Sequence, residues 1–211
     1  MRNAKTALII ILLTILVGVG YFFLPVEKIL GSLPFIKDLY NNTSITVNSK
    51  NGSALVRING RDYGQTPLTI ESLAPGEYEV ILKRVSESPD FYDTRSYKVV
   101  LERNTVAVIE IEIAPGDETG GYILYYSKSP QSDSSGYMTI NNSVDSASVS
   151  LDGEFLTRTP VSAYKLNAKD YQVRISATGY EDTSFPIVIR EGYNLNILSF
   201  QFPIPINIES E

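Results

Sequence analysis

The chain has 211 residues, with 18 basic and 24 acidic side chains and a formal net charge of −6. This balance argues against nucleic-acid binding, which needs clustered Lys and Arg at the phosphates, and against electrostatic docking on anionic lipid. The sequence has no cysteine and no histidine, which excludes thiol nucleophiles, Ser–His catalysis, a lipid-modified cysteine anchor and the commonest metal ligands.

Residues 1–24 predict a cytoplasmic stub followed by one transmembrane α-helix. Residues 7–24 carry no charged side chain. A helix of this length spans roughly 27 Å, close to the ~30 Å hydrocarbon core of a bilayer. Pro25 would end the helix, and Arg2 and Lys5 place the N-terminus on the cytoplasmic side.

Two other interpretations of this segment stay open. In the first, residues 7–24 belong to a cleaved signal peptide, although the apolar run exceeds the usual h-region and residues 17–20 make a poor cleavage site. In the second, the helix lies in a protein core. We favour the uncleaved anchor, with residues 25–43 as a juxtamembrane spacer on the membrane surface or in a half-ordered stalk.

The next feature is an internal repeat. Residues 53–82 and 146–175 align without a gap at a constant offset of 93. An ungapped match of this kind indicates two copies of one module. The motif positions are Asn59, Gly60, Thr66, Pro67, Pro75, Gly76 and Tyr78 in the first copy, and Asp152, Gly153, Thr159, Pro160, Tyr171, Gly179 and Tyr180 in the second.

Each copy has the pattern of a small β-sandwich. Apolar side chains alternate with polar ones, and the Asn-Gly and Asp-Gly pairs predict hairpins with type I′ turns. The Thr-Pro pairs suit a strand end or a sheet edge, Pro75-Gly76 makes a second turn, and Tyr78 and Tyr171 fall on the apolar face. We therefore expect a mostly β chain with two antiparallel sandwich modules in tandem, residues 44–113 and 137–205, and a tail at 206–211.

Residues 114–136 predict a linker, because they are rich in Gly, Ser, Asp and Pro. Such a linker would let the two modules fold and melt separately. The run Tyr122–Tyr126 is too apolar for a free linker, however, and predicts an extra strand added to one module in preference to a binding patch.

The motif residues resemble those of the PEGA domain family. The first copy has Asn59-Gly60, Gly64, Thr66-Pro67 and the turn Ala74-Pro75-Gly76-Glu77-Tyr78. The second copy departs from this pattern with Thr157 in place of Gly64 and Lys169 in place of Gly76, and the first has Phe91-Tyr92 where the second has Gly179-Tyr180. The resemblance implies a non-enzymatic β module of envelope and surface proteins.

No residue set in the sequence predicts catalysis, a cofactor or a metal. Glu110 and Glu112 alternate with isoleucines, which is typical of the solvated face of a strand. The pairs Asp117-Glu118 and Glu181-Asp182 lack the spaced oxygen ligands of a calcium loop.

Tyrosine is the enriched functional residue type, with 14 Tyr and no Trp. Exposed tyrosines stack on sugar rings or anchor protein interfaces. The candidates for such a surface are Tyr63, Tyr92, Tyr125, Tyr126, Tyr164 and Tyr193.

The sequence thus favours a single-pass membrane protein that displays two modules outside the cytoplasm as a scaffold, spacer or adhesion element. Its expected partners are the membrane and an envelope protein or cell-wall polymer. The alternative is a carbohydrate-binding or cell-wall-binding module, which tyrosines gathered on one face would favour.

Overall fold

The structure is a computed structural model that describes residues 42–129, 131 and 135–205. The predicted stub, transmembrane helix and residues 25–41 of the spacer lie outside the described residues, as does the tail at 206–211. Within the described ranges, no helix is long and apolar enough to cross a bilayer.

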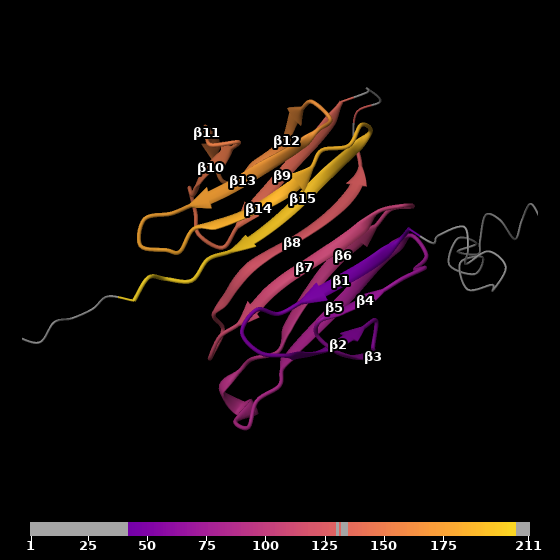
Figure 1. The fold of residues 1–211 in the computed structure, drawn as a ribbon, viewed down its shortest axis with the longest axis vertical. Helices are drawn as coiled ribbons and strands as arrows, with labels where there is room; N and C mark the ends of the chain where they lie inside the picture. The colour runs from indigo at the N-terminus through magenta and orange to yellow at the C-terminus, as the bar shows by residue number, and fades with distance from the viewer. Residues whose placement is uncertain (1–41, 130, 132–134, 206–211) are drawn as a thin grey trace, which may run out of the picture.

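Strands make up most of the described chain (Figure 1). Copy 1 contains β1 (Ser44–Asn48), β2 (Ala54–Ile58), β3 (Arg61–Gln65), β4 (Leu68–Ile70), β5 (Gly76–Arg84), β6 (Arg95–Leu101) and β7 (Val106–Ile113), with a 3-10 turn at Pro89–Phe91. Copy 2 contains β9 (Gly136–Asn142), β10 (Ser148–Leu151), β11 (Glu154–Arg158), β12 (Val161–Leu166), β13 (Asp170–Ser176), β14 (Thr183–Val188) and β15 (Tyr193–Phe200). One further strand, β8 (Thr119–Lys128), lies between them in sequence and in space.

The two copies share one central sheet. Its seven strands have the order β12-β9-β15-β8-β7-β1-β4, while each copy adds a four-stranded sheet, β3-β2-β5-β6 or β11-β10-β13-β14. β8 is antiparallel to β7 on one side and to β15 on the other. The extra strand expected at Tyr122–Tyr126 is therefore present, but it pairs with both modules and not with one.

The side chains of β8 alternate between two cores. Ile123 is fully buried in the copy 1 core, with Ile109 and Ile111 of β7. Tyr126 is buried in the copy 2 core, where Tyr122 and Leu124 also pack. Because successive side chains of a strand point to opposite faces, the two four-stranded sheets cover opposite faces of the central sheet. A half-turn about β8 relates the copies.

The prediction of purely antiparallel sandwiches is corrected by one pairing in each copy. β1 is parallel to β7, and β9 is parallel to β15. Parallel neighbours need a long crossover connection, and here the four-stranded sheet of each copy provides it. The remaining pairs are antiparallel, and each copy has seven strands.

The predicted hairpin turns are confirmed. Asn59 and Gly60 have φ values of 48° and 81°, and Asp152 and Gly153 have 51° and 86°. Both central residues of each turn thus have the positive φ that a type I′ turn requires. The Thr66-Pro67 and Thr159-Pro160 peptide bonds are both cis.

Candidate functional site

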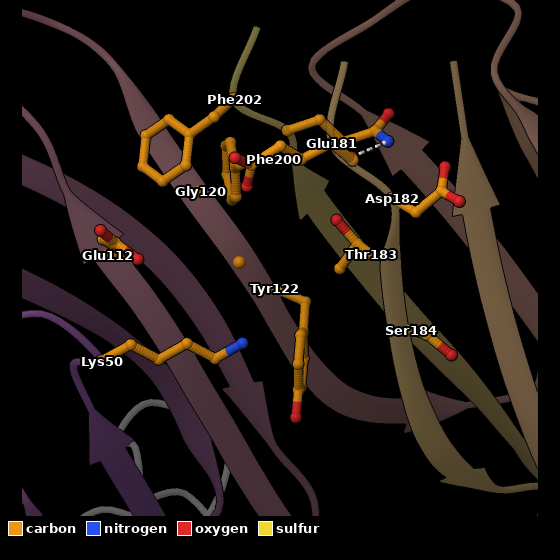
Figure 2. Close-up of a pocket in the computed structure, with 12 residues that line it drawn as sticks. Lys50, Glu112, Gly120, Tyr122, Glu181, Asp182, Thr183, Ser184, Phe200 and Phe202 are labelled. Carbon is orange, nitrogen blue, oxygen red and sulfur yellow. Dashed lines mark hydrogen bonds between the residues drawn. The ribbon is translucent and has the colours of Figure 1, made fainter. Parts of the chain in front are cut away.

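A groove of about 270 Å³ lies where the two copies meet (Figure 2). Copy 1 contributes Lys50 and Glu112, β8 contributes Gly120 to Tyr122, and copy 2 contributes the segment from Glu181 to Ser184. Phe200, Gln201 and Phe202 complete the lining. The groove exists because β14 is the edge strand of its sheet, so the central sheet continues past it uncovered.

Two glycines shape the floor of this groove. A Cβ atom on Gly120 would lie 2.3 Å from the ring of Phe202, so the ring packs directly on the β8 backbone. A Cβ atom on Gly121 would lie 2.0 Å from the Glu110 carbonyl oxygen, and this residue has a φ of 113°. Side chains at either position would displace the C-terminal segment or distort the pairing of β8 with β7.

Among the described residues, some charged side chains of the groove have hydrogen-bond or ion-pair partners and others do not. Asn51 donates a hydrogen bond to Glu112, and Arg174 Nε donates to Asp182 Oδ2 at 3.0 Å. Lys50 and Glu181 have no ion pair from their side chains within the described part of the chain. Figure 2 shows Lys50 extending from copy 1 toward Tyr122, with Glu181 on the opposite wall.

Tyr122 is the aromatic side chain in the middle of the groove. Its ring stacks on Phe185 at a centroid distance of 3.9 Å. Burial raises the pKa of the Tyr122 hydroxyl, and the charge of Glu110 raises it further. The phenol therefore stays neutral and can donate or accept a hydrogen bond.

A second groove of about 580 Å³ lies on the other face of the central sheet. Arg95 and Tyr97 of β6 form one wall, and Ser143 and Tyr180 of copy 2 form the other. The half-turn about β8 exchanges β6 with β14 and therefore relates the two grooves. Their linings differ, because Arg95 takes the place that Thr183 has in the first groove.

The six candidate tyrosines do not gather on one face. Tyr126 and Tyr193 lie edge to face at 6.0 Å, and the Tyr126 hydroxyl donates to the Val188 carbonyl at 2.6 Å. Tyr125 points into the copy 1 side of the same strand. Tyr63 and Tyr92 are half-buried beneath Arg61 and Arg84, and only Tyr164 among the six is exposed.

The carboxylates considered for chemistry are also dispersed. Glu110 accepts a hydrogen bond from Asn48, and Glu112 lies in the first groove. Asp117 and Glu118 line the second groove, on the opposite face. In the described ranges, no three His, Cys, Asp or Glu side chains are placed to hold a metal ion together.

Comparison with known proteins decides the family. The sequence profile of the PEGA domain matches residues 42–116 and, a second time, residues 135–201. The chain belongs to the PEGA domain family. The two matches coincide with the two copies and leave β8 unmatched.

The PEGA chain is also similar to a solved structure titled "The Bacillus anthracis TIE protein". The sequence identity is 16%, the TM-score is 0.28, and the likeness covers 76% of this chain. This chain spans 34% of the length of that structure. A TM-score this low carries no argument about fold or role. No curated protein sequence matches the chain.

The PEGA motif residues form the same hydrogen bonds in both copies. Thr66 Oγ1 accepts from the Ala54 amide at 2.9 Å, and Thr159 Oγ1 accepts from the Ala147 amide at 3.0 Å. The side-chain oxygens of Asn59 and Asp152 each accept from a backbone amide at 2.9 Å. The hydroxyls of Tyr78 and Tyr171 donate to the carbonyl four residues earlier.

The departures from the motif are accommodated locally. Lys169, which replaces a glycine, lies 4.4 Å above the Tyr171 ring and 3.3 Å from an Asp152 oxygen. Gly179 has a φ of 83° and its carbonyl accepts from Ile204, while Tyr180 forms a bridge with Pro203. In copy 1, Pro75 precedes the first residue of β5, Gly76.

The sequence did not predict that the residues of the first groove, called the junction groove below, come together. Lys50, Glu112, Tyr122 and Thr183 come from four separate segments and meet only because β8 joins the copies. The Gly120-Gly121 pair was the available signal, because consecutive glycines inside a strand indicate a close backbone approach.

Proposed function

We propose that the chain is a membrane-anchored envelope protein that displays its PEGA pair outside the cytoplasm and acts by binding and spacing, without catalysis. Residues 7–24 support the anchor, because they are uncharged and of spanning length. PEGA membership supports a role as a β module of envelope and surface proteins.

One observation carries the non-catalytic part of the proposal. Within residues 53–82 and 146–175 the copies retain two Ser/Thr pairs, Thr66/Thr159 and Ser53/Ser146. The threonines are buried and accept hydrogen bonds from the backbone of their own copy. The serines have local roles, because Ser53 directly precedes β2 and Ser146 lies in the turn before β10. A shared active site would keep a polar set directed outward. What the copies share is therefore a scaffold, and each copy can present a different surface on it.

Anchoring is tested by alkaline carbonate extraction. The wild-type chain should stay in the membrane pellet. A Leu12→Arg, Leu16→Arg double variant should be released or fail to insert, since each central charge costs ~2.5–3.5 kcal/mol. Wild-type protein in the soluble fraction, or a mature N-terminus near Gly20, would refute the anchor.

Catalysis is tested separately with glycan, peptidoglycan and envelope substrates. We expect no multiple turnover and no change in melting temperature with chelator. Turnover that Glu110→Gln or Glu112→Gln abolishes would refute the non-catalytic role without touching the anchor.

A second candidate function is binding of a cell-wall polymer in the junction groove. The groove favours polymer binding because it combines the Tyr122 ring with hydroxyl and carboxylate side chains. Small-molecule sites commonly pair apolar or aromatic surface with a few polar groups in this way. Saturation transfer from cell-wall fragments to the full chain should weaken in Tyr122→Ala and persist in Tyr164→Ala. Equal transfer to both variants would count against the groove.

A further inference from the structure

One end of the molecule presents a copy-specific loop with an exposed aromatic side chain. Residues 85–94 connect β5 to β6. Val80 pairs with Tyr97 in copy 1, whereas the matching residue Val173 pairs with Phe185, so this loop is five residues longer than its counterpart. At its apex, Phe91 is 66% exposed.

Hydrogen bonds tie the loop to the segment that follows β7 in spite of this exposure. The Gly116 amide donates to the Phe91 carbonyl at 2.7 Å, and the Asp93 amide donates to the Gly116 carbonyl at 3.3 Å. Arg84 lies 5.1 Å from the Tyr92 ring centroid and donates to the Ile113 carbonyl at 3.1 Å. We call residues 85–94 and 114–118 together the distal tip.

Arg95 closes the base of the distal tip. Its guanidinium donates to the Thr119 hydroxyl and the Gly116 carbonyl, both at 2.7 Å, and to the Glu118 carbonyl at 3.1 Å. Both arginines next to the tip are thus engaged with backbone carbonyls. Binding residues are often carried on loops that a scaffold positions, and an exposed phenylalanine whose own backbone is hydrogen-bonded to Gly116 fits that pattern.

The charges of the distal tip all have one sign. It contains Glu87, Asp90, Asp93, Asp117 and Glu118 and no Lys or Arg. No carboxylate of the tip has an ion-pair partner within the described ranges. The five carboxylates outnumber the two guanidiniums of Arg84 and Arg95 that lie against the tip. The tip is therefore net negative around the exposed side chains of Phe91 and Val85, and it attracts cationic surfaces and repels anionic lipid and nucleic acid.

The distal tip also lies far from the point where the chain enters the fold. Ser44, the first residue of β1, pairs with Val106, the first residue of β7. The tip follows Ile113 at the other end of β7. At ~3.3 Å per residue the two ends are about 23 Å apart.

We propose that the distal tip docks on a basic protein surface whose apolar pocket receives Phe91. The aromatic side chain supplies the buried contact, and the five carboxylates supply a rim that selects and orients a cationic partner. This inference goes beyond the display role, and it holds whether or not residues 7–24 anchor the chain.

The test uses the full chain in mild detergent and a synthetic amphipathic helical peptide made of leucine and lysine as the probe. A leucine–glutamate peptide, a serine–lysine peptide and phosphatidylglycerol vesicles serve as comparison probes. We expect binding to the leucine–lysine peptide alone, weakening as salt rises.

Variants assign the binding to the tip. Phe91→Ala should weaken it by about tenfold or more, and Phe91→Leu should weaken it less. Phe155→Ala is the matched control, because Phe155 is 65% exposed on copy 2, and it should bind like wild type. Asp90→Asn with Asp117→Asn should weaken binding and flatten its salt dependence.

Any of four results would overturn the proposal: no binding of the leucine–lysine peptide, equal binding of a comparison probe, equal loss in Phe155→Ala, or self-association of the chain through the tip. All variants should keep the wild-type melting temperature, because the changed side chains are exposed. If Phe91→Ala lowers both the binding and the melting temperature, the Phe91→Leu variant decides the outcome. It keeps an apolar side chain at the same place, so its loss of binding in a folded chain reports on the contact itself.

Discussion

The two PEGA copies agree in their buried hydrogen bonds and differ in their loops. The Thr–Ala bond and the hairpin bond recur at nearly the same distances, while the β5–β6 loop of copy 1 carries Phe91 and its counterpart in copy 2 carries Gly179-Tyr180. The repeated positions therefore report the requirements of the fold. The positions that differ report what each copy presents to its surroundings.

The largest expected effect comes from the strand that belongs to neither copy. Ile123→Ala should lower the free energy of unfolding by about 2–5 kcal/mol, because Ile123 is fully buried. Since β8 is also paired with β15, the whole transition should move to lower denaturant. Val188→Ala, at an exposed strand position, is the control and should change little. A separate early transition confined to copy 1 would contradict the shared strand.

The next effect compares the two buried threonines. Thr66→Val and Thr159→Val should each cost about 1–3 kcal/mol, because each leaves a buried alanine amide without its acceptor. Equal losses of unfolding free energy would show that the Thr–Ala hydrogen bond stabilises both copies to the same extent. Thr94→Val, at an exposed loop position, should be neutral in the same urea titration.

A smaller effect is expected at the hairpin glycines. Gly60→Val and Gly153→Val should each cost about 1–2 kcal/mol, because a β-branched residue is strained at positive φ and a Cβ atom meets nothing else there. Asn tolerates this conformation, so Gly60→Asn and Gly153→Asn should recover most of the loss. Equal losses for valine and asparagine would exclude backbone strain as the cause.

The smallest expected effect is on the pH dependence of stability, and it concerns Asn59 and Asp152, which occupy the same hairpin position in the two copies. The hydrogen bond from the Gln172 amide lowers the pKa of Asp152, and Lys169 lowers it further. A lowered pKa contributes stability above the unfolded value of about 3.9, and this stability is lost as the pH falls toward the folded value. Asp152→Asn should therefore flatten the acid limb of the stability profile, whereas Asn59→Asp should steepen it. Unchanged profiles in both variants would contradict the assignment.

Local features of the fold could be predicted from the sequence. The type I′ turns and the alternating runs at Val80 and Val173 depend on neighbouring residues, and the structure has them where the pattern predicts. β1 and β9 were not predicted as strands, and each pairs in parallel with a strand distant in sequence, a pairing that no neighbouring residues indicate.

The pairing of β8 with both copies could not be predicted either, because it also joins strands that are distant in sequence. Tyr122–Tyr126 is apolar at consecutive positions because both faces of β8 are covered, by two different cores. The sequence shows the apolar run but not what covers it. Residue type alone also made Tyr126 a candidate for the ligand surface, although its hydroxyl is hydrogen-bonded to the Val188 carbonyl. It did not indicate Tyr122, which lines the junction groove.

The central claim is that β8 makes the two PEGA copies one cooperative unit. Differential scanning calorimetry of the full chain tests it most directly, with residues 43–114 and 136–205 as fragments that lack β8. The shared sheet predicts a single transition whose calorimetric and van't Hoff enthalpies agree, and fragments that are unfolded or much less stable. Two resolved transitions that match two independently folded fragments would contradict it.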